Sequence, residues 1–84
     1  MAQLIKANGE QIDVTPKNGK DFKFEELKEM IGGWIEIVRL RDDKILVVDE
    51  EGMCKEKDIN PVASLMAGFT VVGDVVFCNN NQVL

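Results

Sequence analysis

The chain has 84 residues, of which 45% are apolar and 30% charged, with 15 acidic side chains, 10 basic ones and no histidine. This length predicts one domain, 1–84, and the apolar share excludes a disordered chain. A net charge of −5 without a basic cluster excludes a general nucleic-acid binder, because phosphate contacts dominate such affinity.

The first elements predicted along the chain are a pair of strands. Residues 2–7 and 10–15 alternate on either side of Asn8-Gly9, a dipeptide typical of hairpin turns. Pro16 ends the second strand, since proline cannot donate to a sheet ladder.

A helix is predicted over residues 24–31, where the apolar side chains share one face at helical spacing. Asp21 is the best residue for its N-cap, although it stands slightly early. Gly32-Gly33 supplies the left-handed stop.

The middle of the chain reads as a second hairpin. Residues 34–40 alternate with apolar groups on both faces, which predicts a central strand. Asp42-Asp43 makes the turn, and the nearly continuous apolar run 44–49 predicts a strand buried on both sides. The segment 50–52 then leads the chain out of the sheet.

The last third contains a second helix, over residues 61–68. Asn60 is its expected cap, and Pro61 stands where a missing N–H has no cost. Residues 70–72 and 75–78 are strand-like and 79–84 form a polar tail, while the pattern of 53–59 predicts no element.

Together these elements predict an α+β fold in the order ββ-α-ββ-α-β(β). We expect a small, mainly antiparallel sheet of about five to six strands, with both short helices on one of its faces.

Two cysteines, Cys54 and Cys78, belong to no C-x-x-C pair. We expect two thiols rather than a disulfide, because the chain has no signal segment, and no apolar run approaches the ~20 residues of a membrane span. The sequence predicts a cytoplasmic protein with no membrane contact and no cofactor.

Acidic residues gather at Asp49, Glu50 and Glu51, and grouped carboxylates are the ligands that magnesium and calcium prefer. Consecutive strand residues point to opposite faces, however, and the spacing of a calcium loop is lacking. A solvated turn is therefore favoured over a metal site.

Four residues are candidates for binding a small ligand. Arg39 and Arg41 could face an anion, and Trp34 could stack on a nucleobase. The N–H groups near Asn60, at a helix start, could donate hydrogen bonds to an anion. Two of these residues also have a structural interpretation. Trp34 could belong to the core or to a subunit interface, and Asn60 could serve only as a helix cap.

Catalytic groups are scarce. No histidine can activate Ser64, Thr15 or Thr70, and neither cysteine has a visible base. Enzyme activity stays open, and binding is favoured.

Several short motifs resemble a family of small proteins of unknown function found in phages, prophages and bacterial mobile elements. They are Gly32-Gly33-Trp34-Ile35-Glu36, Val47-Val48-Asp49-Glu50-Glu51-Gly52, Asn60 with Ala63, and Gly73-Asp74-Val75-Val76. The family more often has tyrosine at position 34, and Pro61 departs from its pattern. The resemblance implies an accessory protein acting in the bacterial cytoplasm.

Three functions are compatible with these features. The first is a counter-defence protein that forms a homo-oligomer and sequesters a nucleotide immune signal. The second is an acidic protein that inhibits a host nuclease, a DNA-binding enzyme or another host defence protein. The third is a small metal-dependent hydrolase of a signalling nucleotide.

Overall fold

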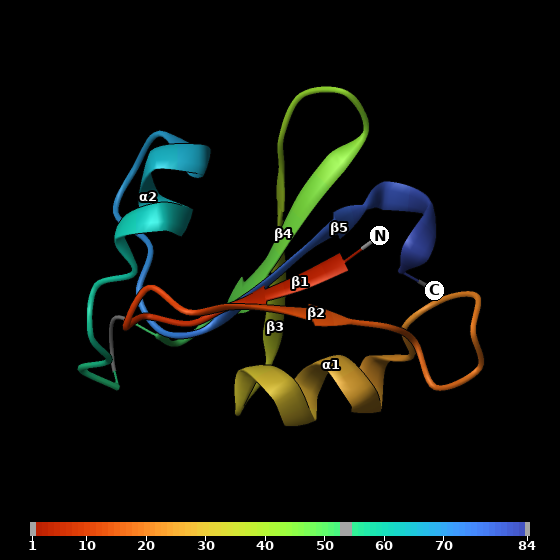
Figure 1. The fold of residues 1–84 in the computed structure, drawn as a ribbon. Helices are drawn as coiled ribbons and strands as arrows, with labels where there is room; N and C mark the ends of the chain where they lie inside the picture. Colours follow the sequence, from red (N-terminus) through yellow and green to blue (C-terminus); the bar gives the residue numbers. More distant parts are fainter. Residues whose placement is uncertain (1, 53–54, 84) are drawn as a thin grey trace.

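The computed structural model describes residues 2–52 and 55–83, which form one five-stranded antiparallel sheet and two α-helices (Figure 1). The strand order across the sheet is β2-β1-β5-β4-β3. In chain order the elements are β1 (Ala2–Ile5), β2 (Gln11–Val14), α1 (Phe24–Ile31), β3 (Ile35–Arg39), β4 (Lys44–Asp49), α2 (Pro61–Ala67), β5 (Val75–Asn79) and the 3-10 helix η1 (Asn80–Gln82). The predicted α+β fold and its order are confirmed.

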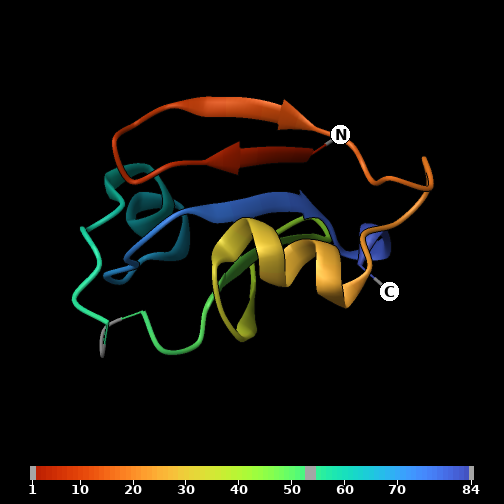
Figure 2. The same cartoon turned by 90° about the horizontal axis from the view of Figure 1, so that it is seen from below.

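The two helices cover opposite faces of the sheet, so the expectation that they share one face is wrong (Figures 1 and 2). Side chains of β4 and β5 alternate between the two faces, and both sets are apolar. Each set needs its own cover, which is why one helix packs on either side. We call these sides the α1 face and the α2 face.

Each face has its own buried cluster. The cluster on the α1 face consists of Ala2, Phe22, Leu27, Ile31, Ile45, Val47, Val76 and Cys78. The cluster on the α2 face consists of Ile5, Leu46, Val48, Ala63, Val71 and Val75. The helix α2 has only seven residues, and partly buried apolar side chains, among them Leu40 and Phe77, border its cluster.

The strand β4 is buried on both faces from Ile45 to Asp49, as its apolar run predicts. Its neighbour β3 is an edge strand, so the predicted central position is wrong. Glu36, Ile37 and Arg39 are exposed along it. The two strands are joined by a turn in which Asp42 and Asp43 both have positive φ.

The helix α1 begins with a different cap from the one expected and ends as expected. Lys23, not Asp21, is the N-cap, and its N–H donates to the Glu26 carboxylate at 3.1 Å. Asp21 instead accepts a hydrogen bond from the Asn18 side chain. Gly32 ends the helix in the left-handed conformation, as predicted.

The C-terminal part of the chain packs back onto the fold. Residues 70–72 form no strand; Val72 makes one isolated bridge to Ile59. The segment predicted as a polar tail contributes Asn79 to β5 and then forms η1, after which Val83 bridges to Phe22. Within the described residues, neither helix is long and apolar enough to cross a membrane.

Cys54 and residue 53 lie outside the described residues, so a pairing of Cys54 with Cys78 is not tested. Among the described residues Cys78 has no disulfide partner, and its thiol is fully buried against α1. Burial raises the pKa of this thiol to about 11, which keeps it protonated and unreactive at neutral pH.

Candidate functional site

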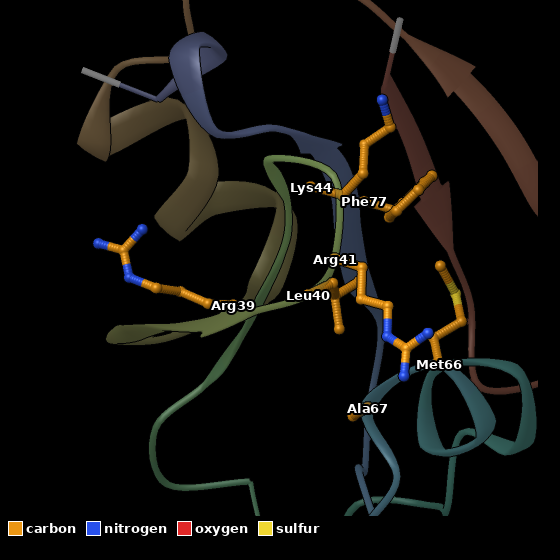
Figure 3. Close-up of a pocket in the computed structure, with 7 residues that line it drawn as sticks. All are labelled: Arg39, Leu40, Arg41, Lys44, Met66, Ala67 and Phe77. Carbon is orange, nitrogen blue, oxygen red and sulfur yellow. The ribbon is translucent and has the colours of Figure 1, made fainter.

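Two of the four candidate ligand residues, Arg39 and Arg41, line the same surface hollow of about 630 Å³ (Figure 3). This volume falls within the range of small-molecule sites. The hollow lies on the α2 face, where the end of β3 and the start of β4 approach α2 and β5. Its lining is completed by Leu40, Lys44, Met66, Ala67 and Phe77.

The hollow exists because α2 is short. Gly68 ends the helix in the left-handed conformation, and its N–H donates to the Ser64 carbonyl. The helix therefore stops beside Leu40 and Phe77 instead of continuing over them. Met66 and Ala67, in its last turn, form one wall.

The basic side chains reach the hollow through the β3–β4 turn. Lys44 N–H donates to the Arg41 carbonyl at 3.2 Å, which closes the chain around Asp42 and Asp43. This brings the backbones of Arg41 and Lys44 together, although their charged ends extend in opposite directions (Figure 3). In Figure 3 the Arg41 side chain extends toward Met66, whereas the Arg39 guanidinium points away from the Arg41 side chain.

The rim of the hollow is positive although the whole chain is acidic. Its seven lining residues include three cations and no carboxylate. In the described parts of the chain, ion pairs involve only Asp49, so none of these three cations is paired with an acid. Arg39 donates to the Asn80 side chain at 3.2 Å and Lys44 to Asn79 at 2.7 Å, both neutral acceptors.

Trp34 lies away from the hollow, beside α1. The residue is 55% exposed, and its ring contacts the Phe24 ring, with centroids 5.8 Å apart. The Lys28 ammonium lies 4.0 Å from the centre of the indole, a cation–π geometry. The structure does not bring Trp34 together with Arg39 and Arg41.

Asn60 is fully buried, and its side chain is used inside the fold. Its amide nitrogen donates to the carbonyls of Ile5 and Gly73, each at 2.9 Å. Its oxygen accepts the Ala63 N–H at 3.0 Å, which caps α2. With these three bonds made, Asn60 joins the β1 end, the β5 entry and α2.

The acidic residues 49–51 do not converge. Asp49 is buried, whereas Glu50 and Glu51 are exposed. The Asp49 Oδ2 atom lies 3.1 Å from Lys55 Nζ and 2.7 Å from Lys57 Nζ, and Oδ1 accepts the Glu51 N–H at 2.8 Å. Two ammonium groups at one carboxylate would repel a metal ion, so these residues are not suited to holding one.

The charge state of Asp49 follows from these contacts. Burial alone would raise its pKa, but the hydrogen bonds from Lys57, the Glu51 N–H and Lys55, with the charge of Lys57, lower it below its ordinary value. Asp49 therefore stays ionised at neutral pH and serves as the centre of a structural ion cluster.

Sequence reasoning missed most of the lining of the hollow. Lys44 could have been found, because a short turn between Arg41 and Lys44 brings the two side chains to one end of a hairpin. Met66 and Phe77 gave no such signal, since their approach to β3 depends on the order of strands in the sheet. Lys55 and Lys57 fall in the segment for which no element was predicted.

Comparison with curated proteins gives no significant match, and neither does comparison with solved structures. A family profile does match, and it covers residues 2–82, which is nearly the whole chain. The chain belongs to the family described as Domain of unknown function (DUF3846).

Proposed function

We propose that this chain acts by binding a small organic anion of the nucleotide class in the hollow between α2 and the β3–β4 turn. The observation that carries the proposal is three cations without acidic partners, gathered on a protein of net charge −5. Such a rim attracts anions, and its effect is strongest at low ionic strength.

The apolar lining of the hollow suits the other part of such a ligand. Leu40, Met66 and the half-buried Phe77 offer apolar and aromatic surface next to the Arg41 guanidinium. A phosphate would meet Arg41, and a flat ring would pack on Phe77. The Lys44 ammonium extends away from the Arg41 guanidinium and donates to Asn79, so Lys44 contributes mainly its charge (Figure 3). Arg39 takes part only through its charge or after a change of rotamer, because its guanidinium points away.

The lining favours binding over catalysis. It contains no hydroxyl, thiol or carboxylate that could act as nucleophile or base. Arginine does not lose its proton in proteins, and the Lys44 ammonium donates to Asn79. A ligand held here would be released unchanged.

The biological form of this proposal is sequestration of a nucleotide immune signal as a counter-defence. Its support is the resemblance of the sequence to proteins of phages and mobile elements, together with a binding hollow that lacks catalytic groups. Sequestration requires tight binding and return of an intact ligand, and both are measurable.

The test is a thermal-shift titration of the protein with linear and cyclic nucleotides, with adenosine and inorganic phosphate as the two halves of the ligand. We expect a nucleotide to raise the melting temperature, with stabilisation of about 2.7 kcal/mol at a hundred times Kd. Neither adenosine nor inorganic phosphate alone should raise the melting temperature by as much as the nucleotide does. No shift across the panel would overturn the proposal, and a chemically altered ligand recovered after denaturation would show an enzyme.

The variant that assigns the site is Arg41→Ala, which should raise Kd about tenfold or more, the value of one charge-assisted contact. Lys20→Ala is the matched control, because Lys20 is an exposed cation in the loop before α1. An equal effect of both variants would mean that only the general charge of the protein matters.

A further inference from the structure

The strand β3 has one side of its backbone without a partner in the described residues, because it is the last strand of the sheet. Trp34 accepts the Glu50 N–H and Leu40 donates to the Lys44 carbonyl, each at 2.9 Å. Alternate residues of an antiparallel strand bond to the same neighbour. Ile35, Ile37 and Arg39 therefore direct their N–H and C=O groups away from the sheet.

Exposed apolar side chains flank this free edge. Trp34 is 55% exposed, Phe24 41% and Ile37 36%. All three lie toward α1: the Trp34 ring contacts Phe24, and Ile37 pairs with Val47, a member of the cluster beneath α1. Unpaired backbone next to exposed apolar groups is a template for a further strand.

The opposite edge, β2, is protected by comparison. Of the exposed residues of β2, Gln11 and Asp13 are polar and Ile12 is a large apolar one. Pro16 follows two residues after the strand ends. Along β3 there is no proline, and its pairing with β4 runs from Ile35 to Arg39 without a bulge. Of the two edges, β3 is the one prepared for pairing.

We propose that β3 pairs with β3 of a second copy of this chain, antiparallel, about a two-fold axis through Ile37. In this register Ile37 lies opposite Ile37, Ile35 opposite Arg39, and Glu36 opposite Val38. All three outward-facing residues meet outward-facing residues, so every free N–H and C=O of the edge gains a partner. The five-stranded sheets join into one of ten strands.

A second copy fits this edge because the strand is complementary to itself. No like charges face each other in the register, whereas opposed like charges would be destabilising. The pairing also places Arg39 of one copy beside Ile35 and the neighbouring Trp34 of the other, where its stem covers exposed apolar surface. The interface is separate from the Arg41 side chain, so this proposal does not depend on nucleotide binding.

Sedimentation equilibrium from about 1 to about 200 μM, the range in which small interfaces associate, tests the dimer. Ile37→Lys should give a monomer, because two ammonium groups would then face each other across the axis. Ile12→Lys is the matched control: it changes an isoleucine of the other edge strand, 42% exposed against 36% for Ile37. It should stay dimeric.

A parent chain that is monomeric throughout this range would overturn the proposal, as would a dimer that survives Ile37→Lys. A dimer abolished by Ile12→Lys and kept by Ile37→Lys would assign the interface to β2 instead. Circular dichroism of each variant establishes that it is folded.

Disulfide trapping tests the register and does not depend on a charged substitution. Hydrogen-bonded antiparallel partners have Cα atoms about 5.5 Å apart, inside the ~4.4–6.8 Å that a disulfide spans. In a Cys54→Ser background, Ile37→Cys should form a covalent dimer under mild oxidation, and Ile12→Cys should not. Equal yields from the two variants, or none from Ile37→Cys, would overturn the two-fold pairing at Ile37.

Discussion

The Lys57 ammonium lies 2.7 Å from the buried Asp49 carboxylate and, at the same time, donates a 3.0 Å hydrogen bond to the Ile31 carbonyl at the end of α1. One side chain thus joins the exit of β4 to the negative end of a helix dipole. Lys55 adds a second ammonium group, 3.1 Å from Asp49. At this corner of the fold, the exit of β4 meets the end of α1 and the segment that carries Lys55 and Lys57.

Glycines leave room for this corner. A Cβ at Gly33 would lie 3.2 Å from the Asp49 carboxylate and still closer to Lys55 Nζ. A Cβ at Gly73 would lie 2.7 Å from the Lys57 side chain. Gly33, Asp49 and Gly73 are among the residues that carry the family resemblance, and their shared role in this structure is to build the ion cluster rather than the hollow.

Replacing Asp49 by asparagine should destabilise the protein by about 2–3 kcal/mol. Breaking a fully buried ion pair costs more, but the Lys55 and Lys57 side chains are 37% and 25% exposed and can turn toward water. Urea unfolding followed by Trp34 fluorescence measures the change. Glu50→Gln, which neutralises an exposed neighbouring carboxylate, should shift stability by less than about 0.5 kcal/mol. Equal effects would show that the cluster has no stabilising role.

Stability should fall at acid pH because of the same carboxylate. The pKa of Asp49 is lower in the folded chain than its ordinary value of 3.8, so its stabilisation is complete above that value and is lost as pH falls through the lower folded pKa. The difference in unfolding free energy between the parent and Asp49→Asn should therefore be constant near neutral pH and shrink below about pH 4. A difference that stays constant down to about pH 2 would contradict the lowered pKa.

Gly73→Ala and Gly19→Ala should separate backbone strain from crowding. Both glycines have positive φ, +78° and +74°, so alanine is strained at each by about 1 kcal/mol. Only the Cβ at position 73 meets another side chain, that of Lys57; at position 19 nothing lies within 4 Å. We expect Gly73→Ala to cost about 1–3 kcal/mol more than Gly19→Ala, as overpacking does. Equal melting temperatures would mean that Lys57 moves aside without loss.

The sequence predicted those parts of the fold that depend on local signals. Gly32 ends α1 and Asn60 begins α2 as expected, because capping involves residues only a few positions apart. The apolar run 44–49 likewise predicts a strand buried on both faces, as the structure shows. That observation already requires a cover on each face, so the placement of both helices on one face could have been rejected from the sequence itself.

Long-range placement could not be predicted in the same way. Alternation assigns Arg39 and Arg41 to one face of an extended strand, but β3 ends at Arg39 and the turn then redirects Arg41 toward α2. Arg39 instead bonds to Asn80, more than 40 positions later in the chain. Contacts of this kind depend on the order of strands, which a single sequence with two similar hairpins does not specify.

Asn60 provides the last prediction, because its two readings, cap or ligand contact, have different consequences. Asn60→Ala would remove the cap of α2 and leave the carbonyls of Ile5 and Gly73 without their donor in a fully buried site. We expect a loss of about 3 kcal/mol, the combined effect of a lost cap and unsatisfied buried groups. Asn60→Asp is the informative partner variant: its carboxylate can still cap α2 but cannot donate to the two carbonyls, so it too should destabilise. Urea unfolding measures both variants, and the thermal-shift assay measures nucleotide binding wherever the fold is retained. A variant that keeps full stability but loses nucleotide binding would contradict the structural role and make Asn60 a ligand contact.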